Sequence, residues 1–216
     1  MINLNLAKRN ADALRILCLG AHSDDIEIGC GGTLLQWKQA YGDLSLDWVV
    51  FCASGARAGE ARAAAELFAS GNKINIVLKE FRDGFLPHTG GAVKEFFEQL
   101  KPQVDPDVIF THRQKDAHQD HRLIAELTWN TFRNHLILEY EIPKYDGDMG
   151  RPQVFVPLDS EIHQSKVRHI MRAFKSQHAK AWFQESTFLS LMRLRGMECN
   201  APSGHAEAFY CRKLVL

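Results

Sequence analysis

The sequence predicts an α/β protein with a Rossmann-like, doubly wound and mostly parallel sheet of strand order 3-2-1-4-5, helices on both faces and C-terminal additions. Three observations support this prediction. Short apolar runs of strand length alternate with helix-like segments from residue 14 to residue 132. Glycine and polar turn residues separate these segments. Two clusters of histidines and aspartates directly follow the first and the fourth apolar run, where such a sheet places its ligand site.

The strands of the parallel sheet are predicted from runs that are too short and too apolar for exposed helices. The runs lie at 14–20, 46–51, 74–78 and 107–111. Because strands that alternate with helices are joined by right-handed crossovers, these runs are expected to lie parallel to one another.

The helices are predicted from composition and capping residues. A tight turn at 29–32 (GCGG) is expected after the first strand, with Thr33 as the cap of a helix that ends near residue 41. The turn could also bind phosphate, but a plain strand-to-helix turn is favoured because the full G-x-G-x-x-G is absent. Further helices are predicted at 56–70, 92–100 and 122–132.

The pattern changes after residue 134. Strands are predicted at 136–141, 154–156 and 206–215, and helices at 160–174 and 185–195. The Gly-, Asp- and Pro-containing stretch 143–152 is predicted to be a surface loop that covers the site. The whole chain, 1–216, is predicted to be a single domain.

Composition excludes several classes of partner. Lys+Arg and Asp+Glu both number 26, so no net charge indicates binding to nucleic acid or to an anionic membrane. No apolar run approaches membrane-spanning length, and the N-terminus lacks the apolar segment of a signal peptide. Five cysteines without a C-x-x-C pair favour a reducing cytoplasm.

The two clusters carry the chemistry. They are 21–25 (AHSDD) and 116–121 (DAHQDH), and the predicted topology brings them to the same edge of the sheet. Two histidines and one carboxylate, with an open fourth position, make a catalytic zinc site. Asp24 is a spare carboxylate beside it and suits a general base. His112 is a ligand by residue type, and its role stays open.

These residues together resemble the PIG-L/LmbE-like family of metal-dependent N-deacetylases. Its members carry A-H-P-D-D, a later Gly-Gly-Thr and D-x-H-x-D-H, which correspond here to 21–25, 31–33 and 116–121. Weaker matches are R-x-x-x-E at Arg62, Asp-Gly at Asp83 and A-E-x-F at 206–209. Two departures are Ser23 in place of Pro and Ile26 in place of a common Glu.

The resemblance implies a role for each residue of the motifs. His22, Asp25 and His121 would bind the metal, with zinc expected and Fe²⁺ or Co²⁺ as alternatives. Asp24 would be the general base. His118 would lie near the developing oxyanion as a general acid or electrostatic stabiliser.

Three further positions would support this chemistry. Asp120 would orient His118 or tune its charge. Arg62 and Asp83 would contact substrate, although Arg62 and Glu66 at i, i+4 could equally be a helix-surface pair.

The resemblance implies hydrolysis of the N-acetyl group of an amino sugar, free or linked to a nucleotide or lipid, as in the biosynthesis of surface polysaccharides or glycoconjugates. Two alternatives stay open. One is another amide hydrolase that uses the same metal site on a thiol conjugate or antibiotic amine, and the other is a non-catalytic sugar- or nucleotide-binding protein. The sequence leaves open whether the chain forms a homo-oligomer.

Overall fold

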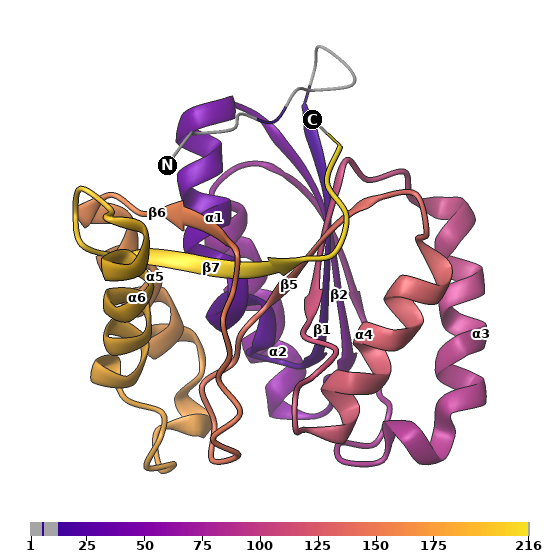
Figure 1. The fold of residues 1–216 in the computed structure, drawn as a ribbon. Coiled ribbons are helices and arrows are strands. Elements are labelled where there is room, and N and C mark those ends of the chain that lie inside the picture. The colour runs from indigo at the N-terminus through magenta and orange to yellow at the C-terminus, as the bar shows by residue number, and fades with distance from the viewer. Residues whose placement is uncertain (1–5, 7–12, 216) are drawn as a thin grey trace.

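The computed structural model describes residue 6 and residues 13–215, and its strands form one seven-stranded sheet (Figure 1). The order is β3-β2-β1-β4-β5-β7-β6. Its first five members are parallel neighbours, which confirms the predicted order 3-2-1-4-5. These five are β1 (Leu14–His22), β2 (Leu44–Cys52), β3 (Lys73–Leu78), β4 (Val108–His112) and β5 (Leu136–Tyr140).

The C-terminal part of the sheet is antiparallel. The last strand, β7 (Ala206–Cys211), lies between β5 and β6 (Val154–Pro157) and pairs antiparallel with both. It therefore connects the parallel sheet to the C-terminal additions.

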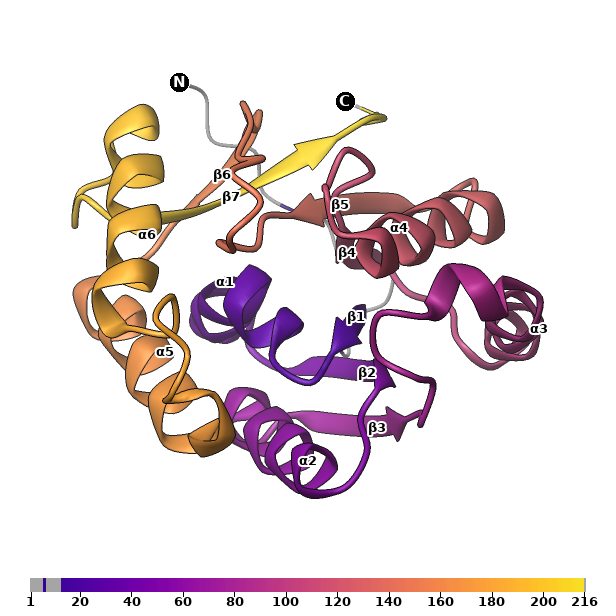
Figure 2. The same cartoon turned by 90° about the horizontal axis from the view of Figure 1, so that it is seen from below.

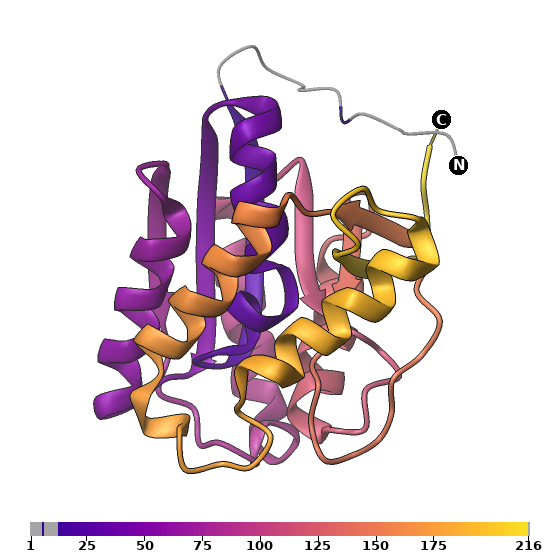
Figure 3. The same ribbon diagram turned by 90° about the vertical axis from the view of Figure 1, so that its left-hand side faces the viewer.

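Helices cover both faces of the sheet, as Figure 2 shows from below. α3 (Gly90–Leu100) and α4 (Gln119–Thr131) cover one face. α1 (Asp25–Tyr41) and α2 (Ala56–Ala69) cover the other. Figure 3 shows α5 (Ser160–Ala173) and α6 (Glu185–Cys199) outside α1. Three short 3-10 helices complete the described elements: η1 (Leu86–Thr89), η2 (Lys101–Gln103) and η3 (Lys175–Gln177).

The two-sided cover explains the continuous apolar run of β1. Alternate side chains of a strand point to opposite faces. Ile16 and Cys18 belong to the core beneath α1 and α2, whereas Leu17 and Leu19 belong to the core beneath α3 and α4. A central parallel strand has no solvent-facing side, and so its sequence shows no polar alternation.

The predicted glycine turn is wrong, because Gly29 to Gly32 lie inside α1. Their role is close packing. A Cβ atom on Gly29 would lie 2.3 Å from Cδ2 of Tyr140, and one on Gly31 would lie 2.5 Å from Cε1 of Phe68. The glycines therefore let α1 approach the sheet and α2 at distances that a side chain would prevent.

A buried ion pair lies against the backbone of α1. Lys166 on α5 contacts Glu207 on β7 at 2.5 Å, and both side chains are buried. The Glu207 carboxylate accepts hydrogen bonds from the N–H groups of Gly32 (2.8 Å) and Thr33 (2.6 Å). The Lys166 ammonium donates to the Ile28 carbonyl at 2.6 Å. The pair thereby ties two C-terminal elements to the helix that begins at the first motif.

Glu27 is the least compensated polar side chain of α1. It is fully buried, and neither carboxyl oxygen has a hydrogen-bond partner among the described residues. We therefore expect Glu27→Met, which removes the buried polar group at similar volume, to raise the free energy of unfolding by about 1–3 kcal/mol. Urea denaturation at pH 7 measures this, with Glu27→Gln as a matched control that should gain less. A destabilised Glu27→Met protein would contradict this interpretation.

No helix in the described part of the chain combines the length and apolarity needed to cross a bilayer. All five cysteines are free thiols, and Cys18, Cys30 and Cys52 are buried.

Candidate active site

The two motifs meet at the carboxyl ends of β1 and β4, which are neighbours in the sheet. The first motif follows β1 and opens α1, whereas the second follows β4 and opens α4. Because parallel strands end at the same edge, residues about a hundred positions apart lie together there. The predicted meeting of the two clusters is therefore confirmed.

A cavity of about 320 Å³ opens over this edge. Its inner wall carries residues of both motifs, and its outer wall is formed by the loop after β5 and the segment before α6. The residues that line it are His22, Asp24, Asp25, Ile28, Arg57, Asp83, His118, His121, Ile142, Pro143, Lys144, Tyr145, Asp146, Lys180 and Trp182.

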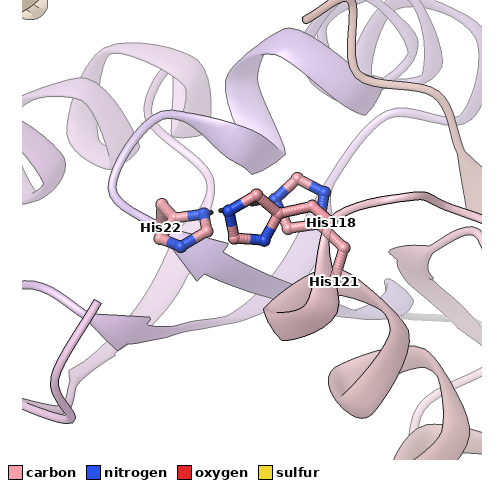
Figure 4. A group of neighbouring side chains, drawn as sticks. All are labelled: His22, His118 and His121. Atoms are coloured by element: carbon pink, nitrogen blue, oxygen red, sulfur yellow. Dashed lines mark hydrogen bonds between the residues drawn. The ribbon is translucent and has the colours of Figure 1, made fainter. Parts of the chain in front are cut away.

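Three side chains form a compact triangle of potential metal ligands. His22 Nδ1 lies 3.2 Å from His121 Nε2 and 3.3 Å from Asp25 Oδ2, and His121 Nε2 lies 3.6 Å from Asp25 Oδ1. Figure 4 shows the facing nitrogens of His22 and His121, with His118 beside them. Two ligands about 2.0–2.2 Å from one tetrahedral ion stand roughly 3.3–3.6 Å apart, and the three contacts fall near this range, with the two Asp25 contacts made by different oxygens. His118 lies close enough to His22 and His121 to form a further group of three possible ligands.

The outward nitrogens of both imidazoles contact carboxylates. His22 Nε2 lies 3.2 Å from Asp120 and 3.1 Å from Asp83, and His121 Nδ1 lies 3.1 Å from Asp116. Such carboxylate–imidazole pairs fix the orientation and tautomer of metal-binding histidines. The donor set and its supporting carboxylates thus fit a divalent metal with mixed nitrogen and oxygen preference.

Asp25 has a strongly polarised environment. Its Oδ2 atom accepts a hydrogen bond from the backbone N–H of His22 at 2.6 Å and lies 3.1 Å from His112 Nε2. Burial alone would raise the pKa of Asp25, but the neighbouring histidines His121, His112 and His22 hold it well below its usual range. The carboxylate is therefore ionised, as a metal ligand must be.

His112 lies behind this triangle, away from the cavity. It is fully buried, stacks on His121 with ring centroids 3.9 Å apart, and its Nε2 accepts the Ala21 N–H at 2.9 Å. It forms a second close group with Asp25 and His121, but it does not line the cavity in the described part of the chain. His112 therefore packs behind Asp25 and His121 and does not reach the cavity wall.

Asp24 turns toward the cavity beside the triangle. Its Oδ1 atom lies 3.2 Å from Nη2 of Arg57, whose Nη1 lies 3.3 Å from Asp83. Burial and the adjacent charge of Asp25 raise the pKa of Asp24, and Arg57 opposes that rise. The result is a carboxylate held at the cavity wall without being part of the triangle.

His118 caps α4 with its own side chain. Its Nδ1 atom accepts a hydrogen bond from the Asp120 N–H at 3.3 Å, and so the neutral ring carries its proton on Nε2. Burial and the nearby His121 and His22 lower the pKa of His118. The imidazole therefore presents an N–H donor to the cavity that it lines.

Of two sequence-based assignments, the first holds in part and the second needs correction. Asp120 contacts His118 through its backbone N–H, and its charge opposes the lowering of the His118 pKa, but its carboxylate contacts His22 and accepts hydrogen bonds from the N–H groups of Gly84 (2.7 Å) and Leu86 (3.1 Å). Arg62 is exposed on α2 and does not line the cavity. Asp83 does line it, where it contacts His22 and Arg57.

Sequence reasoning missed Arg57, the role of Asp116 and the part of the outer wall around Lys180 and Trp182, whereas residues of the predicted 143–152 loop do line the cavity. The available signal for Arg57 was its place just after β2, whose carboxyl end lies at the same edge. Asp116 belongs to the second motif, and its contact with His121 could not be read from spacing. Lys144 lies 3.1 Å from Asp116, so the 143–152 loop is tied to the site as well as lining its cavity.

Comparison with known proteins agrees with this arrangement. The uncharacterized deacetylase YaiS of Escherichia coli K12 is 27% identical over 167 residues, which cover 70% of this chain and 86% of that protein. The N,N'-diacetylchitobiose deacetylase of Pyrococcus horikoshii shares the fold with a TM-score of 0.72 at 19% identity, over 93% of this chain and 84% of that one. The zinc-inhibited form of the teicoplanin deacetylase Orf2 has a TM-score of 0.70 at 15% identity, over 91% and 97%.

The family comparison covers the motifs themselves. The family model PIG-L, described as GlcNAc-PI de-N-acetylase, matches residues 17–132, which is more than half of the chain and includes both clusters. The chain therefore belongs to the PIG-L family of deacetylases.

Proposed function

We propose that this protein hydrolyses the N-acetyl group of an amino sugar, with a divalent metal held by His22, Asp25 and His121. The observation that carries this proposal is the ligand triangle, which faces the same cavity as Asp24 and His118. Family membership and the names of the similar deacetylases support the reaction class. Zinc suits the mixed nitrogen and oxygen donors, and Fe²⁺ or Co²⁺ would suit them too.

A bound metal would polarise the acetamide carbonyl and lower the pKa of a water molecule toward ~7. The chain's own groups supply the proton transfers. Asp24 stands outside the triangle and takes the proton of the attacking water. Arg57 keeps the Asp24 carboxylate pointed at the cavity through the 3.2 Å contact. The same carboxyl group, once protonated, can return the proton to the leaving amine.

His118 serves the oxyanion that forms when water adds to the carbonyl. Its Nδ1 is engaged by the Asp120 N–H, which leaves the Nε2–H group as the donor. A donor fixed by its own helix terminus needs little reorganisation as charge develops on the substrate oxygen.

Acetate release against a panel of N-acetyl sugars tests the function. We expect turnover of at least one N-acetylhexosamine derivative, loss of turnover after chelation, and recovery on addition of one divalent metal per chain. Elemental analysis of the same sample identifies the metal. Release from N-acyl thiol conjugates but from no sugar would favour the alternative amide hydrolase. Sugar binding without any release would favour a binding protein.

His118→Ala should keep the metal and lower kcat by ~10²–10³-fold, because it removes an oxyanion donor and no ligand. Metal content and kcat measured on one preparation check this. His88→Ala is a matched control, since His88 is exposed and does not line the cavity. Loss of the metal from His118→Ala would instead make His118 a ligand.

A further inference from the structure

The loop between β5 and β6 has no regular structure of its own. Neither a helix nor a strand occurs in residues 141–153. In Figure 1 this segment runs to the lower edge of the molecule, where β1 and β4 end. Pro143, Lys144 and Tyr145 line the cavity there. The position of this part of the cavity wall therefore depends largely on side-chain contacts.

One buried ion pair holds both ends of this loop. The carboxylate of Glu141 accepts hydrogen bonds from Nε and Nη2 of Arg195 on α6, both at 2.8 Å, and from the Tyr210 hydroxyl at 2.8 Å. Nη2 of Arg195 also donates to the carbonyl oxygen of Gly150 at 3.1 Å. Glu141 and Arg195 are both buried. Residues 141 and 150 are thus fixed to the same helix, and the part of the loop that lines the cavity lies between them.

Lys144 holds the middle of the loop. Its ammonium lies 2.7 and 2.8 Å from the two carboxylate oxygens of Asp148, within the loop, and 3.1 Å from Oδ1 of Asp116 in the second motif. The Asp148 carboxylate accepts the backbone N–H of Ala117 at 2.6 Å, and its carbonyl oxygen accepts Nη1 of Arg113 at 2.6 Å. The Lys144 side chain is only 11% exposed. An ammonium largely removed from water is thus shared between the loop and the motif.

The surrounding charges explain why a cation is needed at this place. Asp116 contacts the ligand His121 at 3.1 Å and accepts the backbone N–H of His118 at 2.7 Å, so the metal site fixes its position. Asp148 brings a second carboxylate to the same ammonium. Burial and the charge of Asp116 act to raise the pKa of Asp148, yet its hydrogen bonds, chiefly that from Lys144, lower it. Without the ammonium, the two carboxylates would repel each other.

We infer that Lys144 is a positioning residue, which fixes the 143–152 loop against the second motif and so sets the shape of the outer wall of the cavity. Loss of its charge would release the middle of the loop, because Asp116 and Asp148 would then repel each other. The ion pair at the two ends of the loop would remain, so the rest of the fold should not change.

The kinetic consequence of this inference rests on the proposed function. Asp24 and His118 come from the starts of α1 and α4, so release of the loop leaves the groups of the chemical step in place. A loop that is not held forms the cavity wall in only a fraction of the molecules, and apparent substrate binding weakens by that fraction. Lys144 therefore acts on KM more than on kcat.

Chymotrypsin cleavage after Tyr145 tests the contact without any substrate. Tyr145 is 75% exposed, but the protease can cleave beside it only when the flanking loop detaches and extends. We expect Lys144→Met to raise this cleavage rate about tenfold, the effect of losing hydrogen bonds between charged groups. Cleavage after Phe85, which is 38% exposed and lies on another loop, should keep its rate and shows that the variant is folded. Mass spectrometry of the fragments measures both rates in one sample.

Three further variants show whether charge is the reason. Lys144→Arg keeps the cation and should be cleaved at nearly the wild-type rate. Lys144→Met combined with Asp148→Asn removes the repulsion, so this double variant should be cleaved more slowly than Lys144→Met alone. Lys115→Met is the matched control and should behave like the wild-type protein, since it makes the same chemical change at an exposed position that does not line the cavity.

KM and kcat for N-acetylglucosamine and N,N'-diacetylchitobiose complete the test. Lys144→Met should raise KM several-fold and leave kcat within about twofold of the wild-type value, and Lys144→Arg should restore KM. An unchanged cleavage rate after Tyr145 in Lys144→Met would overturn the inference, as would faster cleavage with an unchanged KM. Failure of the wild-type protein to release acetate from any N-acetyl sugar would refute the proposed function instead, and the cleavage rates would still decide whether Lys144 holds the loop.

Discussion

Asp24→Asn should retain the metal and lower turnover by roughly 10²-fold or more. The amide has nearly the shape of the carboxylate and can still face Arg57, but it cannot take a proton from water. Asp24 is not part of the ligand triangle, so the metal should stay. Steady-state acetate release and elemental analysis of one sample measure both effects.

Asp43→Asn is the matched control, because it makes the same chemical change at an exposed position that does not line the cavity. Its turnover should stay close to that of the wild-type protein. An Asp24→Asn variant that retains both metal and turnover would transfer the general-base role to another group.

His121→Ala should lose most of the metal and, with it, the activity. The side chain supplies one of three ligand atoms, and the remaining pair, His22 and Asp25, cannot hold a divalent ion with comparable affinity. Because a ligand that binds only the folded state raises its stability, added zinc should raise the Tm of the wild-type protein and of His118→Ala but not that of His121→Ala.

Comparison of His118→Ala with His121→Ala also shows which of the two neighbouring histidines binds the metal. Metal content decides between them even if both variants are inactive. Full occupancy of His121→Ala together with an empty His118→Ala would mean that their roles are reversed.

The sequence predicts the sheet well because the information is local. Each strand of the 3-2-1-4-5 core is a short and mostly apolar run, and both faces of the sheet are covered. The glycines of α1 were misread because their reason lies elsewhere in the chain: Tyr140 on β5 and Phe68 on α2 occupy the space that side chains would need. The position of β7 between β5 and β6 likewise has no local signal.

In the site, too, the sequence predicts what depends on local motifs and not what depends on contacts with distant parts of the chain. The motifs identify His22, Asp25 and His121 as neighbours, because the sheet order brings the two loops together. They do not tell which way a carboxylate turns. Asp120 faces His22 and the 84–86 loop, since those backbone N–H groups point at it, and Arg57 reaches the site from α2.

The contact of Glu207 and Lys166 with α1 has a consequence for how the site is assembled during synthesis. The helix that starts with Asp25 obtains these backbone partners only after residues 166 and 207 have left the ribosome. Long-range contacts of this kind form late, since the intervening chain must first be ordered. A nascent chain that ends near residue 132 would carry both motifs yet hold them on an unanchored helix, so a competent metal centre should appear only when the last strand docks.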